Sequence, residues 1–221
     1  MRPVKTRSLP RRLPLLALVL LLPLLAQGCW TLDHFSARVR IEPDGGYKYF
    51  LEGTAVHSET VFALRRADYE AKTGKTKPED IKKMVNEADA NLARDLELAR
   101  KDKRVQDIMS IGGGRVRFMA SGKGSISGGE IIFQERDVPL SYAQAPGGAL
   151  SIRLKDAVVG RDAQALGLKV MGNVVITLAE GIEVLEHNAD RTPTGPGGAY
   201  RWRIEGVPGP APHMVIRLPK R

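Results

Sequence analysis

The chain has one cysteine, and its position raises the first chemical question that this sequence poses. Cys29 ends the longest apolar stretch, in the sequence LLPLLAQGCW. A thiol is a nucleophile that reacts with electrophiles or pairs with a second thiol. Because the chain has no second cysteine, an intramolecular disulfide is excluded. A buried core cysteine is the alternative, but such a residue seldom follows directly on an apolar leader.

Other side chains that could do chemistry form no strong pattern. The four histidines are His34, His57, His187 and His213. None lies three to five residues from another, so the spacing predicts no zinc site. Glu186, His187 and Asp190 lie close together and could serve in acid–base catalysis, although such residues after a strand more often solvate a turn. Converging carboxylates around His187 or His57 would be the sign of an enzyme.

Gly74-Lys75-Thr76 matches the end of a phosphate-binding loop, but Tyr69 stands where that loop needs a glycine. The missing glycine removes the backbone cradle for phosphate. The sequence therefore predicts no nucleotide site, no cofactor and no metal, and it favours a protein that is not an enzyme.

The N-terminus has the physical properties of an export signal. An apolar segment runs from Leu13 to Ala26 and is interrupted by Pro14 and Pro23. Before it stand five cations and no acidic residue: Arg2, Lys5, Arg7, Arg11 and Arg12. A bilayer span needs roughly 20 apolar residues, so this run is marginal as a membrane anchor, and cleavage is the better prediction.

Ala26-Gln27-Gly28 before Cys29 resembles the lipobox of bacterial lipoproteins. The resemblance implies cleavage between Gly28 and Cys29, removal of residues 1–28, and a diacylglyceryl group on the thiol with acyl chains such as palmitate. Several acyl chains hold a protein on a membrane where one chain is marginal. Trp30, in the position where Asp would resemble an inner-membrane retention signal, favours the outer membrane of a Gram-negative host over the inner one, with the domain facing the periplasm.

Most of the net positive charge lies in this leader. The whole chain has 34 Lys and Arg against 25 Asp and Glu, and removing residues 1–28 leaves 29 against 25. Aromatic residues make up only 5% of the chain. Since the remaining charges are interspersed, nucleic-acid binding is not predicted. Residues 29–221 suffice for a single periplasmic domain with a Pro/Gly-rich C-terminal segment.

Two elements stand out early in this domain. Residues 35–41 alternate apolar and polar, Asp44-Gly45 provides a tight turn, and residues 47–51 resume the run, which predicts a β-hairpin. Residues 54–72 are ambiguous, and we favour a helix from about Ser58. From Thr76 a capping box and Pro78 predict a long amphipathic helix to about Arg104, fraying toward Ile111.

Short runs in the remainder predict further strands. They are residues 116–118, 131–133, 140–143, 150–154, 174–178, 182–185, 200–204 and 214–218. Strands at this spacing predict an antiparallel, partly barrel-like sheet. The expected fold class is therefore α+β, with that sheet covered by one long amphipathic helix.

The order of these elements resembles the LppM-type domain of bacterial lipoproteins. The resemblance spans about Cys29 to Glu205 and includes the hairpin sequence VRIEPDGGYKYFLEG. Its closing pattern is carried by Gly181, Val184, Asn188, Ala189, Tyr200 and Trp202. The resemblance implies an α+β fold, with a lipid-binding cavity in some members and no catalytic residues.

The sequence thus predicts a lipid-anchored envelope lipoprotein that binds a lipid or amphiphile between helix and sheet. Phe118, Phe133, Tyr142, Trp202 and Met214 are the candidate groove residues, although each could equally belong to an ordinary core. A binding module predicts a cavity above about 300 Å³ there. The alternative is a scaffold for an envelope protein partner, with a filled core and an exposed apolar patch.

Overall fold

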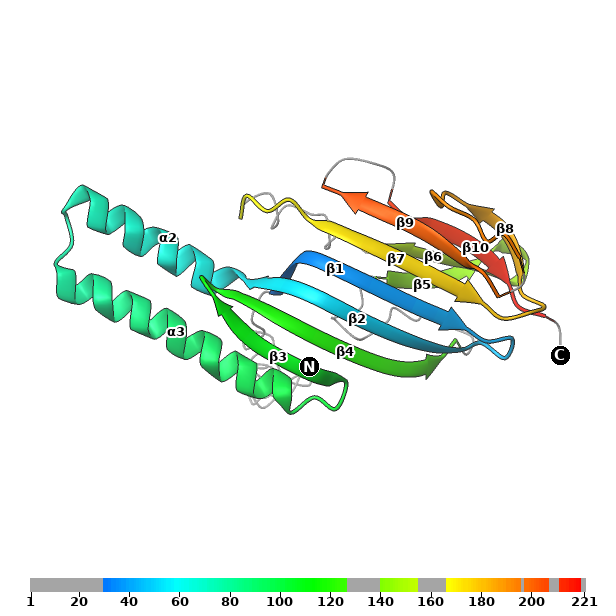
Figure 1. Ribbon diagram of the computed structural model, residues 1–221, viewed down its shortest axis with the longest axis horizontal. Helices are drawn as coiled ribbons and strands as arrows, with labels where there is room; N and C mark the ends of the chain where they lie inside the picture. The colour runs from blue at the N-terminus through cyan, green and yellow to red at the C-terminus, as the bar shows by residue number, and fades with distance from the viewer. Residues whose placement is uncertain (1–29, 127–139, 155–165, 196, 207–210, 220–221) are drawn as a thin grey trace, which may run out of the picture.

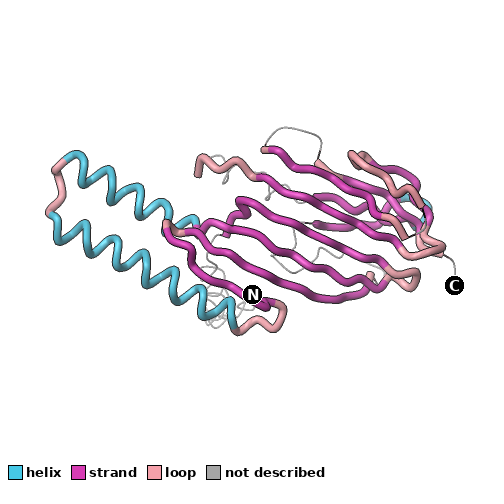
Figure 2. Tube along the Cα trace, in the orientation of Figure 1, coloured by secondary structure: helices cyan, strands magenta, loops and turns pink. Residues whose placement is uncertain are grey.

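The computed structural model describes residues 30–126, 140–154, 166–195, 197–206 and 211–219. Within these residues the chain forms ten strands and two α-helices. Figure 2 shows the strands gathered at one end of the molecule and both helices projecting from the other end.

The strands form two sheets. Sheet A has six strands in the order β3 (Val105–Gly112), β4 (Arg115–Ser125), β2 (Gly46–His57), β1 (Trp30–Ile41), β7 (Met171–Leu178) and β9 (Ala199–Glu205). Sheet B has the order β5 (Leu140–Ala145), β6 (Ala149–Leu154), β10 (His213–Arg217) and β8 (Glu183–His187). The 3-10 turn η2 (Pro146–Gly148) joins β5 to β6. In Figure 1 sheet A lies in front of β5 and β6.

The predicted α+β class is confirmed, but the single barrel-like sheet is wrong. The strands divide between two sheets that do not close into a barrel. Strands β1 and β7 pair in parallel, with His34 opposite Met171 and Ile41 opposite Leu178, whereas the other described pairs are antiparallel. Alternation along a strand identifies its buried face but not its distant neighbour, which explains the error.

The β1–β2 hairpin forms as predicted. Gly45 has a φ of 83°, which glycine adopts without a steric penalty. The amide of Gly46 donates to Oδ1 of Asp44 at 2.8 Å, closing an Asx turn. The hairpin then pairs Ile41 with Tyr47 and continues to Trp30 and His57.

Two helices follow the hairpin. Helix α2 (Ser58–Thr73) begins directly after β2, and α3 (Pro78–Arg100) returns beside it (Figure 1). Pro78 occupies the first helical turn as predicted. The capping box is wrong, because Lys77 is the N-cap residue and the Thr76 hydroxyl instead donates to Oε2 of Glu70 at 2.7 Å.

Helix α3 ends at Arg100, earlier than predicted, and the residues assigned to its frayed end form β3 instead. Asp102 holds the connecting turn. It accepts a hydrogen bond from the amide of Arg104 at 2.9 Å and also bonds its guanidinium. The side-chain hydrogen bond from Arg104 lowers the pKa of Asp102 to about 2.

The larger hydrophobic core lies between the sheets. Apolar side chains from β1, β2, β7 and β9 meet those from β5, β6 and β10, with Met214 and Ile216 of β10 completely buried. Three glycines of sheet A lie beneath aromatic rings of a neighbouring strand: Gly124 with Tyr47, Gly122 with Tyr49 and Gly172 with Phe35. A Cβ on Gly122 would lie 2.5 Å from the Tyr49 ring. These glycines therefore let the rings pack flat in the core.

A second core lies under α3. Leu92 and Leu96 of α3 pack with Ala55, Ile108 and Val116 of sheet A. The strand register places Ala55 and Leu51 on the same face of β2, so sheet B and α3 cover one face of sheet A at opposite ends. Leu32 and Phe118 pack against both cores. The predicted covering helix thus covers only one end of the sheet.

Candidate functional site

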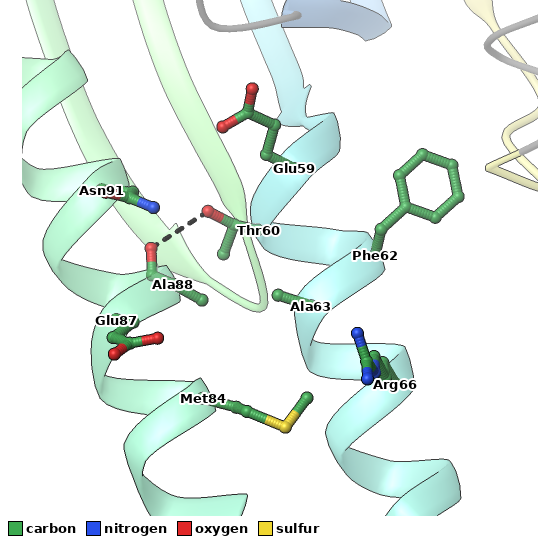
Figure 3. Close-up of a pocket in the computed structure, with 9 residues that line it drawn as sticks. All are labelled: Glu59, Thr60, Phe62, Ala63, Arg66, Met84, Glu87, Ala88 and Asn91. Atoms are coloured by element: carbon green, nitrogen blue, oxygen red, sulfur yellow. Dashed lines mark hydrogen bonds between the residues drawn. The ribbon is translucent and has the colours of Figure 1, made fainter.

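A groove of about 340 Å³ lies between α2 and α3 near the base of the helical hairpin. Figure 3 shows the side chains that surround it, with Met84 and Ala88 of α3 facing Thr60 and Ala63 of α2. The complete lining is Glu59, Thr60, Phe62, Ala63, Arg66, Met84, Glu87, Ala88 and Asn91. Residues three and four apart share a helix face, which is why Thr60, Ala63 and their neighbours line it together.

The lining of the groove mixes apolar and polar side chains, and its charged residues are exposed. Ala63, Met84 and Ala88 are at least partly buried, while Glu59, Arg66 and Glu87 are exposed. Phe62 leaves 48% of its surface exposed. Met is flexible and adapts to irregular apolar groups. Such a lining suits an elongated apolar group that carries a polar or charged end.

A buried trio of polar side chains holds the base of the hairpin together. Nδ1 of His57 lies 2.7 Å from Oγ1 of Thr60, and Nε2 lies 3.1 Å from Oδ2 of Asp95. His57 is 0% exposed. His57 ends β2, Thr60 belongs to α2 and Asp95 to α3, so the trio connects three elements that are distant in sequence.

The geometry assigns the protons of this trio. The Thr60 hydroxyl donates its one proton to the carbonyl oxygen of Ala88 at 3.2 Å, so Nδ1 of His57 must donate to Oγ1. Nε2 of His57 then faces a carboxylate oxygen of Asp95. Both atoms are hydrogen-bond acceptors, so they form a hydrogen bond only when the pair shares a further proton. The Thr60 hydroxyl therefore holds two structural hydrogen bonds, one to His57 and one to Ala88.

The described chain begins beside this groove. Trp30 is paired with His57, and its ring centroid lies 4.8 Å from that of the imidazole. Oγ1 of Thr31 lies 3.3 Å from Oγ of Ser58, in the first turn of α2. Glu59 and Thr60 of the groove follow immediately. The predicted lipidation residue Cys29 and cleavage residue Gly28 lie outside the described residues, but the peptide bond fixes Cys29 next to Trp30.

The predicted groove residues between helix and sheet occupy other surroundings. Tyr142, Trp202 and Met214 are buried in the core between the sheets, while Phe118 is half-buried where the two cores meet. Burial raises the pKa of Tyr142 to about 12. Phe133 lies outside the described residues. The role of these five residues in ligand binding stays a prediction.

The closing sequence pattern connects the two sheets. Oδ1 of Asn188 accepts hydrogen bonds from Nε1 of Trp202 and from the amide of His213, both at 2.8 Å. Its Nδ2 donates to the carbonyl of Ala211 at 2.9 Å. Trp202 belongs to sheet A and His213 to sheet B, so the Asn188 side chain links the two sheets by hydrogen bonds.

The candidate acid–base residues near the end of β8 have different structural partners. His187 Nδ1 accepts the amide of Ala189 at 3.1 Å, Glu186 lies 2.8 Å from Nε2 of His213, and Asp190 accepts the amide of Arg203 at 2.6 Å. Each therefore stabilises a turn or strand end.

Sequence reasoning did not identify the interhelical groove or the trio. One signal was present, since Asp95 stands between Leu92 and Leu96 on the apolar stripe of α3. Within the described residues no group of three or more His, Cys, Asp and Glu side chains could hold a metal ion. No helix in this part of the chain combines the length and apolar character needed to cross a membrane.

The sequence matches no protein-family model and no curated protein. Among solved structures, the chain is similar to the folded domain of LppM from Mycobacterium tuberculosis, determined by NMR. The TM-score is 0.36 and the identity 14%, over 86% of this chain and 92% of that chain. A likeness at this TM-score carries no inference about function.

Proposed function

We propose that the chain is a cell-envelope lipoprotein anchored through acylated Cys29, and that its interhelical groove binds an acyl chain of a lipid or another amphiphile. The anchor would follow removal of residues 1–28, and the domain would face the periplasm, on the outer membrane of a Gram-negative host. The observation that carries the proposal is the position of the groove. Trp30 pairs with His57, and the groove residues Glu59 and Thr60 follow His57 closely in the sequence. A lipid on Cys29 would therefore enter the bilayer close to the groove.

The size of the groove and the apolar part of its lining support this ligand class. Small-molecule sites typically enclose about 300–1,000 Å³ and combine apolar walls with a few polar groups. Ala63, Met84 and Phe62 would contact an acyl chain, and Arg66 at the rim would meet an acidic headgroup. Both walls of the groove are helices, so ligand binding does not require a long loop to become ordered.

A binding role fits the buried trio better than catalysis does. Thr60, His57 and Asp95 have the residue types of a hydrolase triad. A nucleophile must reach its substrate, yet Thr60 is 1% exposed and its hydroxyl donates to a backbone carbonyl. We therefore propose that the trio fixes the two helices that form the groove.

Filling the groove is expected to abolish lipid binding. The full chain would be recovered from bacterial membranes in mild detergent, and bound lipid measured by native mass spectrometry and organic extraction. Ala63→Trp places a large ring between the helices and is expected to lower lipid occupancy at least ten-fold. Ala71→Trp, at an exposed position of the same helix, is the matched control and should retain the lipid. Equal occupancy in both variants, or no noncovalent lipid in the wild type, would contradict the proposal.

A second candidate function, docking of an envelope protein, is favoured by the exposed aromatic residues of α2. Phe62 and Tyr69 are seven residues apart, on one face of the helix, and Tyr69 is 60% exposed. A partner would bury both rings. Tyr69→Asp should then remove a co-purified protein while leaving lipid occupancy unchanged, whereas loss of lipid alone would assign this face to the ligand.

A further inference from the structure

The face of sheet A that points away from sheet B carries a concentration of positive charge. Arg38, Arg40, Lys48, Lys123 and Arg201 form this surface, here called the basic face, and all five are exposed. They come from β1, β2, β4 and β9, and strand register places them together.

The register sets like charges directly opposite one another. Arg40 pairs with Lys48, and Lys48 pairs with Lys123, which makes a row of three cations across three adjacent strands. In the next row Val175 separates Arg38 from Arg201. Like charges in directly paired positions destabilise a sheet. Such a row is therefore costly to the isolated fold and points to an anionic partner.

Acidic neighbours neutralise only part of the basic face. Arg38 lies 3.2 Å from Glu52, and Arg40 lies 2.8 Å from Glu42. Within the described residues, Lys48, Lys123 and Arg201 form no salt bridge. Phe50 adds an apolar group to the middle of this surface, with the Arg38 guanidinium 5.7 Å from its ring centre.

An open hollow of about 820 Å³ adjoins this surface at the turn between β1 and β2. Its lining combines the cations Lys48 and Lys123 with the acidic residues Glu42 and Asp44. The other lining residues are Pro43, Gly46, Tyr47, Gly124 and Ser125. Asp44 is engaged by the amide of Gly46. Two adjacent lysines on the surface of the sheet can together donate hydrogen bonds to a phosphate group.

The basic face and the start of the described domain share one strand. Arg38 and Arg40 belong to β1, which begins at Trp30. At about 3.3 Å per residue, Arg40 lies about 33 Å from Trp30 along the strand. Because Trp30 directly follows Cys29 in the sequence, a domain anchored at Cys29 would stay close to the membrane surface.

We propose that the basic face docks on the anionic phospholipid surface of the membrane that carries the anchor, so that sheet A lies flat on the bilayer. This inference rests on the proposed anchoring at Cys29. Each cation near an anionic bilayer favours the bound state by about five-fold, and tethering supplies the local concentration. Because the Debye length is about 8 Å at physiological salt, docking should be lost at high salt.

Lysine labelling of the reconstituted full chain tests the orientation. The chain would be recovered from bacterial membranes, its acylation verified by intact mass, and placed in nanodiscs of pure phosphatidylcholine or of phosphatidylcholine with 30% phosphatidylglycerol. An acetylating reagent then reports the accessibility of each lysine. We expect Lys48 and Lys123 to react at least five-fold more slowly on the anionic discs, while Lys75 and Lys82 of the helical hairpin react equally on both.

The second part of the experiment removes charge from the basic face but keeps Lys48 and Lys123, the two lysines whose labelling is measured. Arg40→Gln combined with Arg201→Gln is expected to restore most of the labelling of Lys48 and Lys123. Lys82→Gln combined with Lys83→Gln removes the same charge from α3 and should leave the protection intact. Adding 0.5 M NaCl should abolish protection in the wild type.

Three outcomes would overturn the docking proposal. Equal labelling on both discs means that charge does not orient the domain. Protection that persists in detergent without a bilayer assigns the basic face to a second copy of the chain. Protection relieved by a soluble polyanion but independent of disc composition assigns it to an anionic polymer. A chain that carries no acyl group instead contradicts the proposed anchoring, which separates the two failures.

Discussion

Replacing Asp95 with alanine is expected to lower the free energy of unfolding by about 3–5 kcal/mol. The substitution breaks this buried pair and leaves Nε2 of His57 without its partner. Because the trio joins β2, α2 and α3, the loss should separate the helical hairpin from the sheet. Denaturant unfolding followed by circular dichroism measures the effect.

Two matched variants show whether this pair carries the stability. Asp89→Ala removes an exposed carboxylate from the same helix and should change the free energy of unfolding by no more than about 0.5 kcal/mol. Asp95→Asn should cost less than Asp95→Ala, because its amide can donate to Nε2 of a neutral His57. A loss below about 1 kcal/mol for Asp95→Ala would contradict the structural role of the trio.

Trp202→Ala is expected to destabilise the protein by a similar amount, about 3–5 kcal/mol, because it empties a large space between the sheets. The Trp202 side chain is 4% exposed, and its Nε1 donates to Asn188. The substitution therefore removes both core packing and one hydrogen bond that fastens the sheets. Thermal and denaturant unfolding of the same preparation measure the loss.

The control for this variant is Arg203→Ala, which removes the next side chain on the exposed face of β9. Its ion pair with Glu205 is solvent-exposed and should contribute no more than about 1 kcal/mol. If Trp202 instead belonged to a ligand groove, Trp202→Ala would reduce lipid occupancy and leave the free energy of unfolding nearly unchanged. If the ligand instead binds in the interhelical groove, Trp202→Ala should lower the free energy of unfolding and leave lipid occupancy nearly unchanged.

Local features of the sequence predicted the local elements of the fold. Alternation around Asp44-Gly45 identified the first hairpin, and the pattern after Pro78 identified the long helix. The partition into two sheets was not predictable in this way, because a strand such as β7 has the same alternation whichever neighbour it joins. The end of α3 was missed because β3 is a weakly alternating edge strand, with Gln106, Asp107 and Ser110 exposed.

The site was less accessible to sequence reasoning than the fold. His57 and Asp95 are 38 residues apart and meet only after the helical hairpin closes. The basic face likewise depends on β4 pairing with β2 and on β7 and β9 extending the sheet beyond β1, which brings Lys123 and Arg201 to one surface. By contrast, Asn188 and Trp202 both belong to the closing sequence pattern, and the structure joins them by a hydrogen bond of 2.8 Å.

Intact-mass spectrometry of the full chain recovered from bacterial membranes tests the central claim most directly. The account predicts a chain that begins at Cys29 and carries a diacylglyceryl group, with an additional amide-linked acyl chain where the host supplies it. Cys29→Ser should abolish both the lipid and the cleavage before residue 29. A wild-type chain that retains residues 1–28, or that begins at Cys29 without any acyl group, would contradict the account.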